Sequence, residues 1–367
     1  MSGFEHLDDL DDYDTLEGVR NVPARERRRG GNPVSGGAKS PAPLLRTLSP
    51  EEQEVALLAS EQNELHFSYD ASRHERVWIV DSLGGFFDQH SLGDDDHWLD
   101  DILRLIKGGK EAHVYQCLAS STVRGLNSRY IAAKVYRPRQ FRNLKNDHAY
   151  REGREDLDSE GRLITNHGMQ HAMRKKTAYG LELLHTSWVE HEAQTMRRLY
   201  AAGADVPALL VSANNALLMS YIGGDDMPAP TLNSVHLRPK QAPRLFERVL
   251  HNIDLMLAQR RVHADLSAYN ILYWDGSGGF SGSSSSEITL IDFPQAIDPL
   301  GNRNAFTIFQ RDVRRVCEYF ERQGVRSDPR RLALDLWRKH GYSPTPEIHP
   351  ALLDGDDDRD RALWQGE

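Results

Sequence analysis

Residues 263–272 read His-Ala-Asp-Leu-Ser-Ala-Tyr-Asn-Ile-Leu, and a second apolar stretch leads into Ile291-Asp292-Phe293. Asp265 stands five residues before Asn270, and Asp292 follows Asn270 by 22 residues. This spacing is typical of phosphoryl transfer, in which one acid orients or deprotonates the nucleophile while an amide oxygen and a later carboxylate hold Mg²⁺. We therefore expect Asp265 to be the catalytic aspartate, and Asn270 and Asp292 to bind the metal.

An alternative interpretation needs no chemistry. Asp and Asn are common turn residues, so Asp265 could form a turn and Asp292 could cap the end of a strand. Any one of these residues alone fits that alternative. All three in order, with apolar strands on either side, favour phosphoryl transfer.

Upstream, Lys134 lies inside the apolar strand predicted over Tyr130–Tyr136. A buried ammonium costs free energy unless it is paired, so we expect a carboxylate partner. A helix predicted over Gly180–Gly203 offers Glu190 and Glu192, whose directions differ by about 200° at 3.6 residues per turn.

Glu192 shares its helix face with the apolar residues Trp188, Met196 and Leu199, whereas Glu190 shares a face with Gln194, Arg197 and Arg198. We therefore expect Glu192 to pair with Lys134. The alternative, an ordinary surface glutamate, stays open because a helix-face argument can slip by one residue.

The segment Gly108–Val114 precedes Lys134 by about the length of a hairpin. Its backbone amides could cover a triphosphate, with Lys110 reaching toward it. Two glycines and a lysine also make an ordinary turn, and only the position relative to Lys134 favours the phosphate loop.

Around these motifs the chain divides by composition. Residues 1–50 combine an acidic opening, arginines at 25–29 and Gly/Pro/Ser punctuation, and we expect a disordered tail. The arginines could contact RNA phosphates, or they are simply a solvated charge run. Residues 51–101 are expected to form an N-terminal extension that packs on the next domain, with a helix from Ser49 and a β-rich run over 76–87.

The central domain is expected over 102–323. Its first part, 102–222, holds strands near 102–117, 130–136 and 206–221 together with the 180–203 helix, and a charged, mobile insertion reaches from 137 to about 179. Its second part, 223–323, holds helices at 244–261 and 308–323 and two short strands joined by a Gly/Ser loop at 275–286. Residues 324–367 are expected to be a helix near 330–340 and an acidic tail.

Composition excludes several classes of protein. The 367 residues carry a formal net charge of −9, with 39% hydrophobic and 27% charged residues, unlike collagen-like or membrane-spanning chains. Two cysteines, Cys117 and Cys317, give no disulfide framework or zinc site. The acidic N-terminus is unlike a secretory signal, and no stretch reaches 18 apolar residues. We expect a cytoplasmic protein that does not bind membranes.

Together the motifs resemble the RIO family of atypical serine/threonine protein kinases, nearer its type-one branch. The matching segments fall in the family's order over about Ile102 to Gln323: GGKEAHVY, AAKVY, the W-x-E-x-E helix at 188–192, LLMSYIGG, HADLSAYNIL and IDFPQA. The resemblance implies an α+β, two-lobed kinase-like fold with a small β-rich N-lobe and a reduced helical C-lobe.

The resemblance also implies roles for individual residues. Asp265 would be catalytic, Asn270 and Asp292 would bind Mg²⁺ or Mn²⁺, and Asp292 could accept the phosphate itself, which would make the protein partly an ATPase. The catalytic set would be Asp265, Asp292, Lys134 and Glu192. The ATP-binding set would be Lys110, Val114, Ala132, Lys134, Met219, Ser220, Ile222 and Leu272, with 219–222 as the hinge against adenine.

The departures from ordinary kinases bear on the substrate. His263-Ala264-Asp265 and Asp292-Phe293-Pro294 replace H-R-D and D-F-G, there is no A-P-E, and only 75 residues follow Asp292. These residues leave little room for the helices on which ordinary kinases dock peptides, so the departures bear on the protein substrate and not on ATP binding. A small-molecule kinase of the aminoglycoside or choline type, and a nucleotide-switched ribosome-assembly factor with little turnover, remain alternatives. The family implies a ribosomal particle or RNA as a possible partner.

Overall fold

The computed structural model describes residues 66–68, 73–88, 92, 96–126, 128–137, 153–213, 215–225, 227–275 and 287–345. Several sequence expectations lie outside these residues: the tail at 1–50, the helix from Ser49, the first part of the insertion after 137, most of the Gly/Ser loop and the acidic end of the chain.

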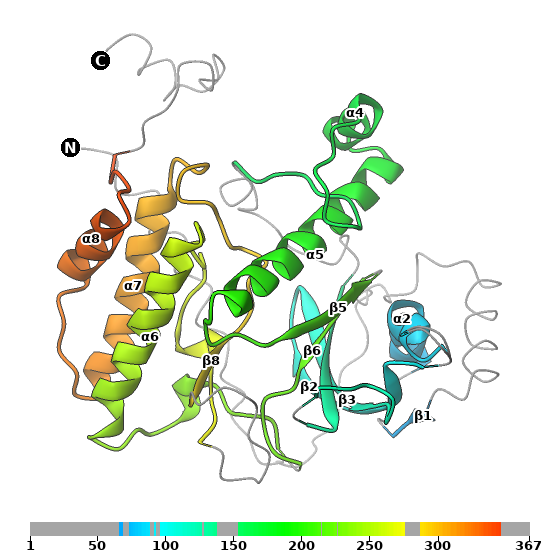
Figure 1. Cartoon of the computed structure of the whole chain (residues 1–367), viewed down its shortest axis with the longest axis horizontal. Coiled ribbons are helices and arrows are strands. Elements are labelled where there is room, and N and C mark those ends of the chain that lie inside the picture. Colours follow the sequence, from blue (N-terminus) through cyan, green and yellow to red (C-terminus); the bar gives the residue numbers. More distant parts are fainter. Residues whose placement is uncertain are drawn as a thin grey trace, which may run out of the picture. The chain divides into compact units, whose positions relative to one another are not determined.

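The first lobe is built on one six-stranded sheet with the strand order β1-β2-β3-β4-β6-β5 (Figure 1). The strands span β1 (His66–Phe67), β2 (Leu99–Gly108), β3 (Ala112–Ala119), β4 (Tyr130–Tyr136), β5 (Leu209–Ala213) and β6 (Ala216–Ser220). β1 pairs with β2 in parallel, and the other pairs are antiparallel. β4 lies between β3 and β6, and all seven of its residues are buried.

The two faces of β4 are covered by different helices. Side chains alternate along a strand, so even-numbered residues such as Ala132 and Tyr136 face one way and Ile131, Ala133 and Val135 face the other. The even face joins the apolar cluster of α5 (Ala178–Ala201), and the odd face joins that of α2 (Arg73–Leu83). Lys134, which is even-numbered, therefore points toward α5.

The β-rich run expected over 76–87 is wrong. The structure has helix α2 followed by a 3-10 turn at Gly84–Phe86. The local Val-Trp-Ile-Val run favours a strand, but Ile79 and Leu83, four residues apart on a helix, bury completely against the outer face of the sheet. Tertiary packing overrides β-propensity here.

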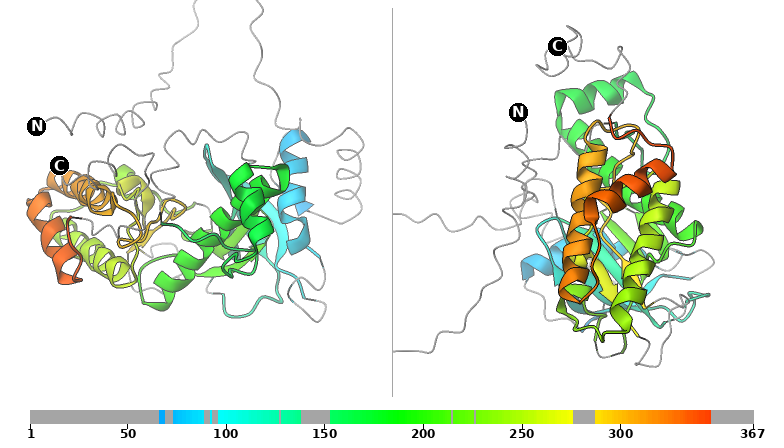
Figure 2. Two further views of the ribbon diagram at one scale, coloured as in Figure 1. Left: turned by 90° about the horizontal axis from the view of Figure 1, so that it is seen from above. Right: turned by 90° about the vertical axis from the view of Figure 1, so that its left-hand side faces the viewer.

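The second lobe is mainly helical. It contains α6 (Gln241–Ala258), α7 (Ala305–Arg322) and α8 (Pro329–Lys339), with a small sheet of β7 (Ile271–Tyr273) and β8 (Ile288–Leu290). Seen from above, these helices gather at one end and the larger sheet with α2 lies at the other, with α5 between them (Figure 2). Asp328 caps α8 by accepting from the backbone N–H groups of Arg330 and Arg331.

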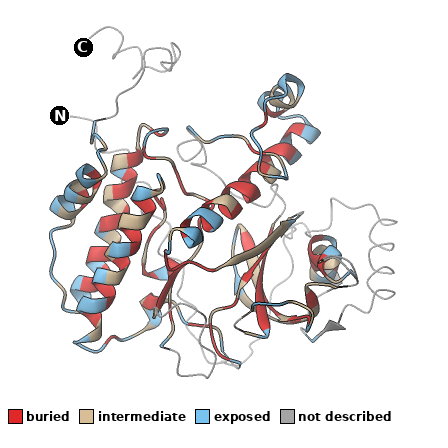
Figure 3. Ribbon diagram, in the orientation of Figure 1, coloured by how far each residue is buried: buried red, intermediate tan, exposed pale blue. Residues whose placement is uncertain are grey.

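Burial follows this two-lobed plan. α5 is buried over most of its length, whereas α4 (His167–Lys175), which packs on the first turns of α5, is largely exposed (Figure 3). The expected α+β fold with a β-rich N-lobe and a reduced helical C-lobe is confirmed. In the described part of the chain, no helix is both long and apolar enough to cross a membrane.

Candidate active site

The buried ammonium of Lys134 has the partner that its position in β4 requires. Its Nζ lies 2.8 Å from Oε1 and 3.1 Å from Oε2 of Glu192 on α5, and the Glu192 side chain is only 1% exposed. Glu190 instead pairs with Arg197 at 2.8 Å and accepts from Ser212. The helix register expected from the sequence is therefore the one observed.

A second carboxylate shares the same ammonium. Oδ1 of Asp292 lies 2.6 Å from Lys134 Nζ, so the loop after β8 meets the N-lobe at this point. Glu192 also accepts a hydrogen bond from the backbone N–H of Phe293 at 3.2 Å and another from the Tyr136 hydroxyl. We call Lys134, Glu192, Asp292 and Tyr136 the Lys134 cluster.

The Lys134 cluster contains one cation and two carboxylates. Burial works against the charge of Lys134, but Asp292 and Glu192 outweigh it and raise the pKa of the ammonium. Burial likewise works to raise the pKa of Asp292, but the Lys134 ammonium, aided by Lys107, holds it below its usual value. Lys134 and Asp292 are therefore charged at neutral pH, and the Lys134 ammonium forms ion pairs with the carboxylates of both Asp292 and Glu192.

Asp292 is also conformationally unusual. Its φ of 74° lies in the left-handed region, which costs a non-glycine residue about 1–2 kcal/mol. Its side chain is 36% exposed, and among the described residues its Oδ2 accepts no hydrogen bond. One oxygen is thus held by Lys134 while the other is available to a ligand.

The second loop of the site carries Asp265. Asn270 Nδ2 donates to the backbone oxygen of Asp265 at 2.8 Å and to its Oδ2 at 3.0 Å, while Arg315 Nη1 lies 3.2 Å from its Oδ1. Partial burial raises the pKa of Asp265, and the Asp292 charge adds to the rise, while His263 and Arg315 oppose it. The amide nitrogen of Asn270 faces Asp265, which leaves the amide oxygen free for another ligand.

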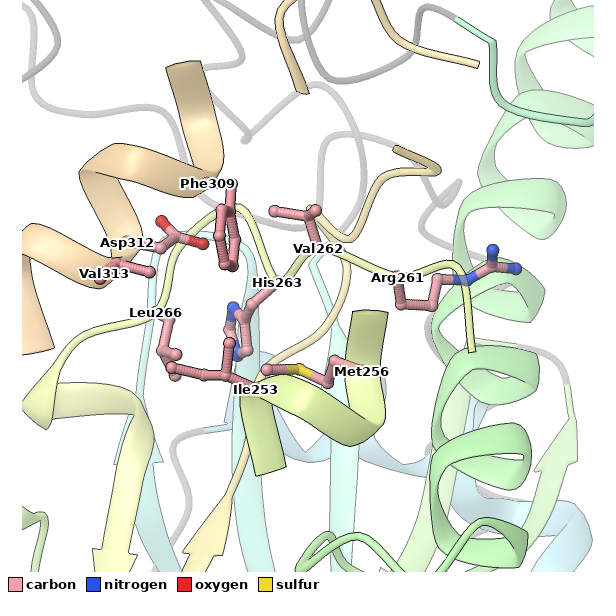
Figure 4. A pocket seen from close by; sticks show the side chains of 9 residues that line it. All are labelled: Ile253, Met256, Arg261, Val262, His263, Leu266, Phe309, Asp312 and Val313. Atoms are coloured by element: carbon pink, nitrogen blue, oxygen red, sulfur yellow. The ribbon is translucent and has the colours of Figure 1, made fainter. Parts of the chain in front are cut away.

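The backbone of the Asp265 loop is strained, and residues of α7 hold it through hydrogen bonds. Ala264 has a φ of 67°, and its N–H donates to Oδ2 of Asp312 on α7 at 2.7 Å, while Arg311 donates to its carbonyl. His263 Nε2 lies 3.1 Å from the carbonyl of Ile291, which ties this loop to the Asp292 loop. A cavity of about 10 Å³ lies beneath it between α6 and α7, where His263 and Asp312 project toward each other (Figure 4). That volume suits at most one water, not a substrate.

The residues expected to contact adenine line the inner face of the sheet. Ala132 is paired with Met219 in register, and both are buried in the same apolar cluster that Val114 packs against. Ser220 ends β6, Ile222 lies on the connection to the second lobe, and Leu272 lies on β7. Lys110 is exposed on the turn between β2 and β3, where Gly109 is required because a Cβ there would lie 2.8 Å from the Ala112 oxygen.

A divalent cation fits the oxygen atoms of this site. Among the described residues no group of three or more His, Cys, Asp or Glu side chains forms a metal site. Mg²⁺ is typically held by one or two protein oxygens together with substrate phosphates, so a full protein cage is not required. Asp292 Oδ2 and the Asn270 amide oxygen are such atoms, and the negative charge of the Asp292 carboxylate favours a cation.

Comparison with known proteins then identifies the family. The model of the RIO domain matches residues 113–332, more than half of the chain. The chain belongs to the RIO family. The matched range thus contains the loop of Asp265, the loop of Asp292, strand β4 and helix α5.

Curated relatives agree with this assignment. Serine/threonine-protein kinase RIO3 of Homo sapiens is 31% identical over 140 residues, which are 38% of this chain and 25% of that protein. RIO-type serine/threonine-protein kinase Rio1 of Haloferax volcanii is 29% identical over 229 residues, 61% of this chain and 64% of that protein. The chain therefore spans about a quarter of the length of human RIO3.

A solved structure is also similar to this chain. It is the crystal structure of the Rio2 kinase-ADP/Mg²⁺-phosphoaspartate complex from Chaetomium thermophilum, with a TM-score of 0.45 and 18% identity. The match covers 88% of this chain and 95% of that one.

The structure also brings to the site residues that sequence reasoning missed. Tyr136 donates to Glu192, Lys107 acts on the charge of Asp292, and Asp312 and Arg315 reach the Asp265 loop from α7. Only Tyr136 had a usable signal, since it stands two residues after Lys134 and so shares its strand face. The α7 residues lie about 50 positions from the loop that they contact, and no local pattern joins them.

Proposed function

We propose that this RIO domain transfers the γ-phosphoryl group of ATP in a Mg²⁺-dependent reaction, as a serine/threonine kinase with ATPase activity. The observation that carries the proposal is the sharing of Lys134 between Glu192 and Asp292, opposite a loop that holds Asp265 and Asn270. The Asp292 carboxylate is partly exposed, lies in the left-handed region of φ and keeps one oxygen open, which is the state that a metal ligand requires.

In this proposal each residue has a separate task. Lys134 contacts the ATP phosphates, and Glu192 keeps that ammonium in place with the help of Tyr136. Asp292 and Asn270 offer oxygens to the metal, which when bound neutralises charge on the phosphates. Val114, Ala132 and Met219 present an apolar surface to the adenine, with Ser220 and Ile222 at its edge and Leu272 beneath.

Asp265 is proposed to orient the attacking oxygen. Its raised pKa favours proton acceptance, but Arg315 and Asn270 already occupy both of its oxygens, so orientation is the main contribution. The nucleophile is then a hydroxyl, a water or, as the family resemblance implies, the carboxylate of Asp292. In the last case a P–O bond to ADP breaks, an acyl phosphate forms on Asp292, and water later releases inorganic phosphate.

The partner and the location belong to the proposal as well. The names of the relatives support a protein hydroxyl as acceptor, and the family resemblance supports a ribosomal particle as the place of action. A cytoplasmic location and membership of the type-one branch are consistent with the sequence features.

The test follows γ-labelled ATP. The wild type should turn over ATP slowly and only with Mg²⁺ or Mn²⁺, and Asp265→Asn should lose most of that turnover. Hydroxylamine cleaves an acyl phosphate but not a phosphoserine, so label released by hydroxylamine would place the phosphate on a carboxylate. A wild type that neither binds nor hydrolyses ATP with either metal would contradict the proposed function.

A further inference from the structure

The carboxylate of Asp265 is held on both oxygens from two different elements. Asn270, five residues further along the same loop, donates to Oδ2 at 3.0 Å. Arg315, which lies on α7, places Nη1 3.2 Å from Oδ1. One restraint is therefore local to the loop, and the other comes from the core of the C-lobe.

α7 contacts the Asp265 loop at a second point one turn away. Asp312 precedes Arg315 by three residues, so the two share a helix face, and its Oδ2 accepts from the backbone N–H of Ala264 at 2.7 Å. The Arg315 side chain is 18% exposed, so the protein surrounds most of it. The helix thus fixes the loop backbone through Asp312 and the loop carboxylate through Arg315.

A carboxylate with one hydrogen bond can still turn. The terminal torsion of an aspartate is broad and has no sharp staggered minima, so Asn270 alone leaves the direction of the second oxygen poorly defined. Productive geometry must be kept within about 0.5 Å and 10–20°. A guanidinium on the second oxygen removes this freedom, and its planar fork does so better than an ammonium.

We propose that Arg315 is a positioning residue for Asp265, fixing the carboxylate that orients the attacking hydroxyl or water. This inference rests on the proposed function and deepens it. Arg315 binds the acid of the Asp265 loop, whereas the nucleotide and the metal are assigned to Lys134, Asn270 and Asp292. Its loss should therefore lower kcat and leave the affinity for Mg²⁺-ATP unchanged.

Three variants test the proposal: Arg315→Ala, Arg315→Lys and the control Arg314→Ala. Arg314 is the neighbouring arginine on α7, 46% exposed and 3.8 Å from Glu318. Arg315→Ala should lower kcat for ATP turnover by about 10- to 100-fold, the scale of a misplaced catalytic group. Arg315→Lys should keep part of the activity, and Arg314→Ala should match the wild type. Added guanidinium chloride at non-denaturing concentration should restore kcat of Arg315→Ala and leave the other proteins unchanged.

A merely structural role predicts other results. If kcat of Arg315→Ala stays within about twofold of the wild type, a change too small for a lost positioning contact, the proposal is overturned. The same holds if guanidinium does not raise kcat while Tm equals that of the wild type, or if the affinity for Mg²⁺-ATP falls as much as kcat. Should Arg315→Ala not fold, Arg315→Lys with a wild-type Tm and unchanged kcat would overturn it. A wild type without ATP turnover would instead contradict the proposed function.

Discussion

Two buried ion clusters in this chain differ in whether they are complete. Between α5 and β5, Asp205 accepts from Arg248 Nε at 2.6 Å and Nη2 at 2.7 Å and from Asn252 Nδ2 at 2.7 Å, both on α6, and its side chain is 3% exposed. One anion meets one cation, and both carboxylate oxygens are used. We call this the Asp205 cluster.

The Lys134 cluster has the opposite character. It has two carboxylates for one ammonium, and Asp292 sits in a left-handed conformation with one oxygen open to a ligand. Under the proposed function, the difference separates a carboxylate that stabilises the fold from one that is kept for binding. Burial of an ion pair is therefore not by itself a sign of function, whereas an unbalanced and strained pair is.

The sharpest contrast is expected from Asp292→Asn. It should lower ATP turnover by about 10²–10³-fold, the scale for a lost electrostatic group in an active site. It should not lower Tm, because Asn tolerates the left-handed region at least as well as Asp and the cluster becomes charge-balanced. Turnover assays and thermal denaturation check both halves. Wild-type turnover, or a Tm several degrees lower, would contradict the distinction between the two clusters.

The corresponding substitution in the Asp205 cluster is Asp205→Ala. The Arg248 side chain is partly exposed and can be solvated, but the buried Asn252 loses a hydrogen-bond acceptor, so the free energy of unfolding should fall by about 1–3 kcal/mol. Turnover per folded molecule should stay at the wild-type level, because the hydrogen bonds of the Asp205 carboxylate go to Arg248 and Asn252 on α6 and not to either loop of the site. Urea denaturation with active-site titration measures both quantities. Unchanged stability, or a loss of turnover in the folded fraction, would argue against a purely structural cluster.

Tyr136→Phe tests the contribution of the hydrogen bond from Tyr136 to Glu192 in the Lys134 cluster. It removes one donor from the buried Glu192, which should cost about 1–2 kcal/mol and lower kcat by roughly tenfold as Lys134 loses its fixed partner. Tyr130→Phe is the control, since Tyr130 lies on the same face of β4 but its hydroxyl accepts from Arg129. Equal effects of the two substitutions on kcat would contradict the assigned role of Tyr136.

The smallest effect is expected at Asp254 on α6, which forms ion pairs with Lys339, the last residue of α8, and with His340 next to it. Partial burial works to raise the pKa of Asp254, but hydrogen bonds from Lys339 and His340 outweigh it and leave the pKa below its usual value. A lowered folded-state pKa gives stability that is present above the unfolded-state pKa of about 3.9 and is lost as pH falls through the folded value.

Asp254→Asn should therefore cost less than about 1 kcal/mol at pH 7 and nothing once the carboxylate is protonated. Denaturant titrations of both proteins across pH measure the difference. A destabilisation that persists at acidic pH would show that the contact of Asp254 with Lys339 and His340 stabilises the protein through packing and not through charge.

The sequence predicted the parts of the site that are local in the chain. The Asp265–Asn270 spacing, the inward direction of Glu192 and the strand around Lys134 all follow from short-range periodicity, and the structure brings these residues together. The two-lobed fold was implied by the resemblance to the RIO family. Spacing and periodicity relate residues that lie within a few positions of one another, and this is the range over which sequence patterns carry information.

What could not be predicted depends on tertiary contact. α2 formed where a β-branched run favoured a strand, because Ile79 and Leu83 gain burial on the sheet. The direct contact of Asp292 with Lys134 joins residues 158 positions apart, and Arg315 reaches Asp265 across 50. No periodicity in the chain encodes such distant pairings.

The most direct test of the open site is calorimetric titration of ATP with Mg²⁺ and with a chelator, on the wild type and on Asp292→Asn. We expect Mg²⁺ to strengthen ATP binding to the wild type by at least about tenfold, because the metal offsets the charge between the phosphates and the carboxylate, and we expect Asp292→Asn to lose this gain. Equal wild-type affinities with and without Mg²⁺, or a full Mg²⁺ gain in Asp292→Asn, would contradict the assignment of Asp292 as the carboxylate kept open for the metal.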